Sequence, residues 1–156
     1  MAENPDYREL LQLLNDFEVD YLIVGGFAVM KYGEPRYTKD LDLWIDCSAA
    51  NCLRLVEALK KFGAPLEHDG ITPETFTERQ VVYQIGIAPV RVDILTQITG
   101  VEFADGWKNR VPGTFFGIPV QFISQGDLEV NKRALSRARD LEDLMRSPKK
   151  KRSPKK

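Results

Sequence analysis

The stretch YLIVGGFAVMKYGEPRYTKDLDLWID, residues 21–46, contains the pattern that decides the fold. An apolar run ends in the pair Gly25-Gly26, and a second run follows in which Asp40 and Asp42 alternate with leucines. Side chains of a strand point alternately to the two faces of its sheet, so both carboxylates lie on one face. The stretch therefore predicts two strands separated by a glycine turn and a short helix. The acids either belong to an ordinary half-buried strand or hold something strongly positive.

A third carboxylate stands on a similar strand further along the chain. In VRVDILT, residues 90–96, apolar side chains alternate with Arg91 and Asp93. If this strand neighbours the first acidic strand, Asp40, Asp42 and Asp93 converge, and convergent carboxylates repel one another unless a cation lies between them. Oxygen ligands suit Mg²⁺ or Mn²⁺, and two such ions about 4 Å apart form the usual clamp for nucleotidyl displacement. The pattern therefore predicts a divalent-metal site.

Helical and strand patterns alternate along the rest of the chain. Apolar residues at helical spacing predict helices, and short apolar runs bounded by glycine or proline predict strands. The predicted helices cover residues 5–17, 27–33, 48–63 and about 125–145, and the predicted strands cover residues 19–24, 40–46, 80–87, 90–98 and 117–124. Ser48 is the expected N-cap of the third helix, and Gly63 its end. This interleaving predicts an α/β (α+β) fold in which helices flank a mixed central sheet.

Charge divides the 156-residue chain into an acidic body and a basic tail. Residues 147–156, SPKKKRSPKK, carry six of the 22 basic residues and no acid, so residues 1–146 hold 16 basic and 23 acidic residues. A tail with two prolines and no apolar residue is expected to be disordered. Residues 1–146 have the size of one domain. No apolar run approaches the roughly 20 residues that span a bilayer, and no signal segment is visible, so we expect a cytoplasmic protein without membrane contact.

The glycine pair has two interpretations. A Gly-Gly turn after a buried strand lets backbone N–H groups approach a phosphate chain closely, with the start of a helix behind it. Most such pairs are simply turns. An Asp-x-Asp strand within twenty residues makes the phosphate interpretation of Gly25 and Gly26 more specific.

Three segments together resemble the DNA polymerase beta-type nucleotidyltransferase superfamily: LIVGGFAVMKYGEPRYTKDLDLWID, VRVDIL and the closing DLEVNKRALSRARDLEDL. They are most similar to small stand-alone bacterial members related to the AbiEii-type toxin group. The resemblance implies a mixed sheet flanked by helices and a Gly25-Gly26 turn that cradles the triphosphate. It further implies that Asp40 and Asp42 coordinate Mg²⁺ and that Asp93 completes the triad as a ligand and as the base. Many members carry Gly-Ser where this chain has Gly25-Gly26-Phe27, so a hydroxyl contact to phosphate is missing.

Other residues could contact the nucleotide phosphates. Arg36 and Thr38 lie in the loop that leads into the acidic strand and could reach phosphates, or they are solvated loop residues. Lys132 lies on a charged flank of the last helix, where the resemblance implies a lysine that faces the nucleotide phosphates. The apolar stripe expected to bury this helix consists of Val130, Ala134, Leu135, Ala138, Leu141 and Met145.

The sequence thus predicts a metal-dependent nucleotidyltransferase that uses a nucleoside triphosphate and Mg²⁺ or Mn²⁺. RNA is the first candidate acceptor and a protein the second, as expected for the toxin-like part of a toxin–antitoxin module with an antitoxin-like partner chain. An inactive nucleotide-binding or partner-binding module on the same fold is the alternative. In a third interpretation the Ser-Pro-Lys-Lys repeats of the tail bind a DNA minor groove.

Overall fold

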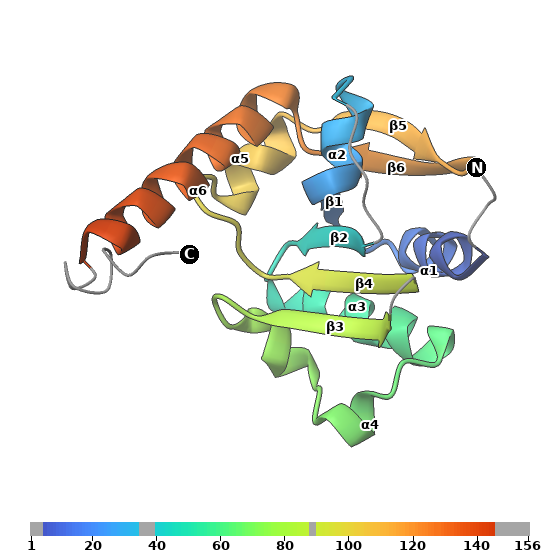
Figure 1. The fold of residues 1–156 in the computed structure, drawn as a ribbon. Coiled ribbons are helices and arrows are strands. Elements are labelled where there is room, and N and C mark those ends of the chain that lie inside the picture. The colour runs from blue at the N-terminus through green and yellow to red at the C-terminus, as the bar shows by residue number, and fades with distance from the viewer. Residues whose placement is uncertain (1–4, 35–39, 88–89, 146–156) are drawn as a thin grey trace.

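The computed structural model describes residues 5–34, 40–87 and 90–145 (Figure 1). The helices are α1 (Pro5–Asp16), α2 (Gly25–Lys31), α3 (Ala49–Phe62), α4 (Leu66–Asp69), α5 (Phe103–Lys108) and α6 (Gln125–Met145), with a 3₁₀ turn η1 (Pro73–Thr77). The strands are β1 (Tyr21–Val24), β2 (Asp40–Ile45), β3 (Val82–Ile87), β4 (Val90–Leu95), β5 (Val111–Phe115) and β6 (Ile118–Phe122). No helix in these three segments is long and apolar enough to cross a bilayer.

A single six-stranded sheet, in the order β3-β4-β2-β1-β6-β5, organises the molecule. The pairs β2–β4 and β1–β6 are parallel, whereas β1–β2, β3–β4 and β5–β6 are antiparallel. The predicted mixed α/β architecture is therefore confirmed. The two strands that carry the acids, β2 and β4, are direct neighbours near the middle of the sheet (Figure 1).

The alternation predicted for β2 separates a packed face from a polar one. Leu41, Leu43 and Ile45 are fully buried on the face that α1 and α3 cover, where these two helices also contact each other. On the opposite face α2 lies beside the start of β2, and α5 covers Trp44 closely enough that a Cβ added to Gly106 would lie 2.9 Å from its ring. The polar face is therefore covered at its Trp44 end and bordered by α2 at its acidic end.

The ends of α3 agree with the sequence prediction. Ser48 accepts a hydrogen bond from the backbone N–H of Asn51 over 3.3 Å, which satisfies one free donor of the first turn. Gly63 ends the helix with a φ of 95°, a left-handed conformation that glycine adopts without strain. These two residues explain why α3 has the length that its sequence predicts.

Four short elements were not predicted, namely α4, η1, α5 and β5. β5 has the sequence VPGTF and stands at the edge of the sheet, where proline and glycine are tolerated but a strand pattern is weak. The helix α5 has only six residues, with Gly106 among them, too few for helical periodicity to show. In addition, α2 begins at Gly25, two residues earlier than predicted.

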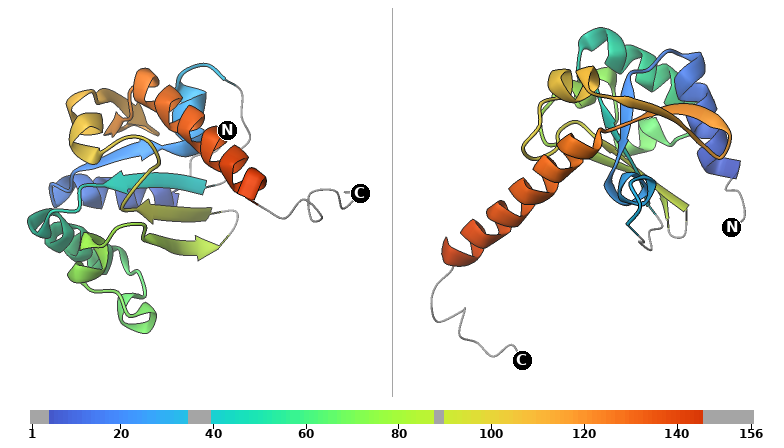
Figure 2. Two further views of the ribbon diagram at one scale, coloured as in Figure 1. Left: turned by 90° about the vertical axis from the view of Figure 1, so that its left-hand side faces the viewer. Right: turned by 90° about the horizontal axis from the view of Figure 1, so that it is seen from above.

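The prediction of a buried stripe along α6 is wrong. Within α6 only Leu128 is buried, whereas Val130, Leu135, Leu141 and Met145 of the expected stripe are exposed, the last two at 59% and 77%. The first half of α6 contacts the loop after β4, where Asn131 donates a hydrogen bond to the carbonyl of Thr99. The second half extends past the sheet (Figure 2). A helix of 21 residues is about 31 Å long, and the body ends before the helix does.

Candidate active site

Neighbouring positions on β2 and β4 hold the three predicted carboxylates. The parallel register pairs Asp42 with Asp93, and Asp40 with Arg91, so these four side chains belong to the same face of the sheet. Asp93 is buried, with 9% of its surface exposed, whereas Asp40 and Asp42 are partly buried. We call Asp40, Asp42 and Asp93 the acid cluster.

Arg91 supplies a counter-charge to the acid cluster. Its Nη2 lies 2.8 Å from Oδ2 of Asp40, and its Nε lies 3.2 Å from Oδ1 of Asp93. The Arg91 side chain is 33% exposed, so water screens both ion pairs only in part. The sequence prediction assigned the cation at this position to a metal alone. The signal for Arg91 was the spacing of two residues between Arg91 and Asp93, which places both side chains on one face of a strand.

Gly25 lies against the carboxylate of Asp42. Its φ is +70°, and a Cβ built at this position would collide with Oδ2 of Asp42 and lie 2.9 Å from Cγ. Any other residue would therefore be strained in its backbone and would also displace the carboxylate. Gly26 follows in the first turn of α2. The structure thus brings the glycine turn into contact with the acid cluster.

The environment of Asp42 disfavours its charged form. Burial raises its pKa to about 7, and the neighbouring charges of Asp93 and Asp40 act in the same direction, while Arg91 opposes them. A carboxyl group that titrates near neutral pH exchanges its proton readily for a cation. The acid cluster therefore combines three like charges, and among the described residues Arg91 lowers the pKa of Asp42 without cancelling the rise.

The donor set of the acid cluster is chemically suited to a hard divalent ion. All its atoms are carboxylate oxygens, the ligands that Mg²⁺ and Mn²⁺ prefer. In the described parts of the chain, however, no group of three His, Cys, Asp or Glu side chains already has the arrangement of a metal site. Arg91 holds two of the three carboxylates, which is a physical reason for that arrangement to be incomplete. A divalent ion would have to replace these contacts.

The described side-chain contacts of Lys132 are with Glu34 and not with the acid cluster. Its Nζ is 3.4 Å from both carboxylate oxygens of Glu34, a residue just beyond the C-terminal end of α2. The Gly25 turn is at the opposite end of α2, about 10 Å away for a helix of seven residues. Arg36 and Thr38, the other predicted phosphate contacts, lie outside the described residues, as does the tail at 147–156.

The site is bordered by an aromatic residue, Tyr7, that the sequence analysis did not indicate. Tyr7 of α1 donates a hydrogen bond over 3.3 Å to the carbonyl of Arg91, and burial is the main cause that raises its pKa. Its ring is 6.1 Å from the rings of both Phe27 in α2 and Phe115 in β5. The carboxylates of the acid cluster raise the pKa of Tyr7 further, so its hydroxyl lies within their field. The three aromatic residues are far apart in the sequence, and no local pattern connects them.

The fold has a counterpart among solved structures. It matches the crystal structure, at 1.87 Å resolution, of a protein from Thermotoga maritima described provisionally as a nucleotidyltransferase. The TM-score is 0.66, the identity is 15%, and the match covers 92% of each chain. At this identity the likeness concerns the fold alone, which is a nucleotidyltransferase fold as predicted.

The family model of the aminoglycoside-2''-adenylyltransferases matches residues 6–136, and the chain belongs to this family. The family and the fold together support a nucleotidyltransferase, in agreement with the predicted superfamily. The narrower resemblance to the AbiEii-type toxin group stays a prediction. A search of the curated proteins finds no match.

Proposed function

We propose that this protein transfers a nucleoside monophosphate from a nucleoside triphosphate to an acceptor hydroxyl, with a divalent cation held by Asp40, Asp42 and Asp93. The observation that carries the proposal is the register that pairs Asp42 with Asp93 across two parallel strands, directly beside the Gly25 turn. Carboxylates on adjacent strands next to a close backbone approach suit a bound metal ion and phosphate chain.

Each residue has a separate task in the proposed reaction. When bound, Mg²⁺ or Mn²⁺ supplies the positive charge that offsets the developing negative charge on the phosphate oxygens. Asp93 accepts the proton of the acceptor hydroxyl while that oxygen forms a bond to the α-phosphorus. The bond from this phosphorus to the bridging oxygen breaks, and pyrophosphate leaves with its electron pair. The backbone N–H groups of Gly25 and Gly26 orient the triphosphate, without help from a serine hydroxyl.

Other predicted contacts support the phosphates from outside the acid cluster. Lys132 would turn from Glu34 towards the triphosphate, and Arg36 and Thr38, which precede β2 in the sequence, would also contact it. Arg91 keeps the carboxylates compensated before the cation arrives, since it already contacts Asp40 and Asp93. The residues of this chain thus bind and orient the nucleotide, and the chemistry needs one proton acceptor.

The acceptor hydroxyl could belong to three kinds of molecule. An RNA end is our first choice and a protein side chain our second, because the basic residues 147–156 could hold an acidic macromolecule against the acidic body. In this case the protein would act in the cytoplasm, as the toxin-like part of a two-gene module with an antitoxin-like partner. The family name suggests an aminoglycoside, a small hydroxylated compound, as the third candidate.

The decisive experiment incubates the purified protein with each α-³²P-labelled nucleoside triphosphate, Mg²⁺ or Mn²⁺, total RNA, cell lysate and an aminoglycoside, followed by separation of the fractions. We expect label in one acceptor fraction, its loss in EDTA, and at least about a 10³-fold lower rate for Asp42→Asn. Asp16→Asn, an acid-to-amide change on the surface of α1, should keep the parent rate.

Each outcome of this experiment selects between the candidates. Label on RNA that disappears when residues 147–156 are deleted supports tail-assisted RNA modification, and label on protein or on the aminoglycoside selects the corresponding acceptor. Transfer that persists in Asp42→Asn would overturn the proposed metal site. Nucleotide binding without any transfer would favour the alternative of an inactive module.

A further inference from the structure

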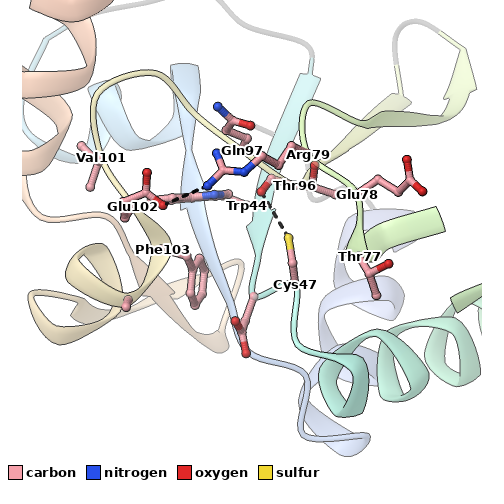
Figure 3. A pocket seen from close by; sticks show the side chains of 12 residues that line it. Trp44, Cys47, Thr77, Glu78, Arg79, Thr96, Gln97, Val101, Glu102 and Phe103 are labelled. Atoms are coloured by element: carbon pink, nitrogen blue, oxygen red, sulfur yellow. Dashed lines mark hydrogen bonds and ion pairs between the residues drawn. The ribbon is translucent and has the colours of Figure 1, made fainter. Parts of the chain in front are cut away.

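A cavity and an exposed helix end lie outside the proposed active site. The cavity, of about 270 Å³, lies where β2 and β4 end, and its walls include Trp44, Cys47, Arg79 and Glu102 (Figure 3). The thiol of Cys47 donates to the carbonyl of Thr96 over 3.3 Å, and Arg79 lies 3.8 Å from Glu102. These polar groups of the wall already have partners, whereas the end of α6 exposes apolar side chains.

The second half of α6 carries apolar residues that a single chain leaves in water. The exposed fractions are 38% for Leu135, 59% for Leu141, 72% for Leu144 and 77% for Met145. This half extends past the sheet, so the described body does not cover it (Figure 2). Single exposed apolar residues are common, but several within three turns of one helix form a patch. Such a patch marks an interaction surface.

The patch continues the contact that holds α6 on the body. At Ala134 the helix lies tightly against the loop after β4, since a Cβ added to Gly100 would lie 2.8 Å from the Ala134 Cβ. From there Ala134, Ala138, Leu141 and Met145 follow one another at intervals of four, three and four residues. These are the intervals of the a and d positions in a coiled coil, which pack against a second helix. We call these four residues the α6 seam.

The α6 seam is complementary to itself when two copies of the helix run antiparallel. A two-fold axis between residues 139 and 140 places Ala138 opposite the partner's Leu141, and Ala134 opposite the partner's Met145. Each small side chain then faces a large one, which lets the two helices interdigitate. A symmetric dimer uses one surface of both copies in this way.

The order of charges along α6 favours the antiparallel orientation. Residues 132–139 hold four basic side chains and no acid, whereas residues 140–143 hold three acids and no base. A parallel pair would set like charges beside one another, and an antiparallel pair sets the basic segment beside the partner's acidic segment. The two-fold axis brings Arg137 near the partner's Asp140 on one flank of the seam. On the other flank it brings Arg139 near the partner's Glu142.

The same order of charges is unfavourable for α6 on its own. The C-terminal end of a helix carries partial negative charge, so acidic side chains there lower its stability. The last turn of α6 has no basic side chain and contains Glu142 and Asp143. An antiparallel second copy supplies both a basic segment and an opposed helix dipole at this end. The charges and the apolar patch therefore point to the same occupant.

We propose that this protein forms a dimer in which the α6 helices of two copies pair antiparallel along the α6 seam. The inference is independent of the proposed reaction, because no seam residue belongs to the acid cluster or the glycine turn. An overlap over residues 134–145 is about 18 Å long. Two helix segments of this length bury less than the roughly 1,200–2,000 Å² of a standard interface, so we expect a dissociation constant of about 10–100 µM.

Sedimentation velocity of the full chain tests for the dimer. Between about 2 and 500 µM the parent should shift from the mass of one chain towards that of two. Leu141→Gln places an amide at the centre of the seam and should raise the dissociation constant about tenfold or more. The matched control Leu53→Gln changes a leucine of α3 that is 56% exposed, and it should leave the constant unchanged. Both leucines are exposed in a single chain, so the circular dichroism and urea midpoint of dilute protein should stay those of the parent.

A charge exchange tests whether the flanking contacts join two chains. Arg137→Glu alone and Asp140→Arg alone should each weaken self-association, because each variant sets like charges beside one another across the two-fold axis. An equimolar mixture of the two variants should dimerise as well as the parent, because each chain then supplies the charge that the other needs. Interactions within one helix do not predict this recovery.

Cysteine cross-linking tests the orientation. Ala138→Cys and Leu141→Cys, both in a Cys47→Ser background, are mixed and mildly oxidised. An antiparallel pair should cross-link one variant to the other, because residues 138 and 141 face each other across the axis. A parallel pair would cross-link each variant to itself.

Four results would overturn the proposal. One is the mass of a single chain at every concentration up to about 500 µM, in which case the patch serves a different partner. Another is a dimer that is equally tight in Leu141→Gln and in the parent, since the two copies then meet elsewhere. A mixture of the charge variants that dimerises no better than either variant alone would refute the pairing of the flanks, and cross-links within each cysteine variant would refute the orientation.

Discussion

The two ends of the polar sheet face differ in how their buried polar groups are satisfied. At the acid cluster, charged groups are compensated by Arg91, whereas at the other end the indole Nε1–H of Trp44 and the Oε1 of Gln97 are buried without a partner among the described residues. A cation that enters the acid cluster must displace an ion pair, whereas the Trp44 and Gln97 atoms are enclosed by the protein and could gain a partner only if side chains around them moved. Cation binding at the first end is therefore a competition with Arg91, whereas the unmade hydrogen bonds at the second end are a cost of packing.

The largest effect on this comparison should come from Gly25→Ala, because its Cβ would collide with the Asp42 carboxylate. Gly33→Ala is the matched control, since Gly33 also has a positive φ, 96°, but a Cβ there meets nothing within 4 Å. Backbone strain alone costs about 1–2 kcal/mol, so Gly33→Ala should lower the free energy of unfolding by that amount. Gly25→Ala should lower it by about 3 kcal/mol or more and should also weaken Mn²⁺ binding.

Urea unfolding and calorimetry with Mn²⁺ measure these two effects. Equal losses of stability in the two variants would mean that Asp42 moves away from residue 25 at no cost. The close contact between the glycine turn and the acid cluster would then have no bearing on the site.

Arg91→Gln should remove the competition between Arg91 and a divalent ion for the carboxylates, and the stability of the variant should then depend on metal. Without the guanidinium the carboxylates repel one another, and we expect a lower free energy of unfolding in EDTA than that of the parent. Mg²⁺ or Mn²⁺ should restore part of this loss and should bind more tightly than to the parent. Arg133→Gln, which removes an exposed ion pair with Glu129, should cost less than about 1 kcal/mol and should not respond to metal. Urea unfolding at a fixed ionic strength, with and without metal, measures these changes in stability. If Arg91→Gln binds the metal no more tightly than the parent, Arg91 and the cation do not compete for the carboxylates.

The pH dependence of stability should reveal the strain at Asp42. Its usual pKa of 3.8 applies in the unfolded chain, and the folded value is about 7. Between these values the folded state binds more protons than the unfolded state, so stability decreases as the pH rises from about 4 to about 7. Asp42→Asn removes this loss. In EDTA the variant should match the parent near pH 4 and exceed it by about 1–3 kcal/mol at pH 8.

Thermal unfolding across this pH range gives the measurement. The difference in free energy of unfolding between parent and variant could instead be the same at pH 4 and at pH 8. That result would show that Asp42 ionises without cost, and the acid cluster would then have little reason to attract a cation. Saturating Mn²⁺ should flatten the pH dependence of the parent and leave that of Asp42→Asn unchanged.

The sequence could predict those parts of the site that depend on patterns between residues close together in the chain. Alternation along β2 and β4 gives the face on which Asp40, Asp42 and Asp93 lie, and the structure confirms that the two strands are neighbours. Alternation also places Arg91 on the same face as Asp93, whichever strand lies beside β4. It cannot say whether Arg91 or a metal ion compensates the carboxylates. The contact of Tyr7 with the Arg91 carbonyl joins residues 84 positions apart, and no local pattern contains it.

The last helix shows the same limit for the fold. Helical periodicity predicts α6 over residues 125–145, and the structure has the helix there. Periodicity also identifies an apolar stripe, but it cannot say how far the body extends under the helix. Leu141 and Met145 are exposed because α6 runs beyond the sheet and not because the stripe is absent (Figure 2). Burial therefore depends on the length of the neighbours, which the helix sequence does not contain.

The smallest expected effect concerns Lys132, whose only described ion-pair partner is Glu34. Both side chains are exposed, at 38% and 58%, so breaking the pair should change the free energy of unfolding by less than about 1 kcal/mol in either Lys132→Ala or Glu34→Ala. Their effects on function should differ, because only Lys132 can contact phosphate. Lys132→Ala should weaken binding of a non-hydrolysable nucleoside triphosphate in Mg²⁺ about tenfold, whereas Glu34→Ala frees the lysine and should leave this affinity equal or higher. Equal triphosphate affinity in the two variants would mean that Lys132 serves the surface of α6 alone, and that the acid cluster and the glycine turn hold the phosphates without it.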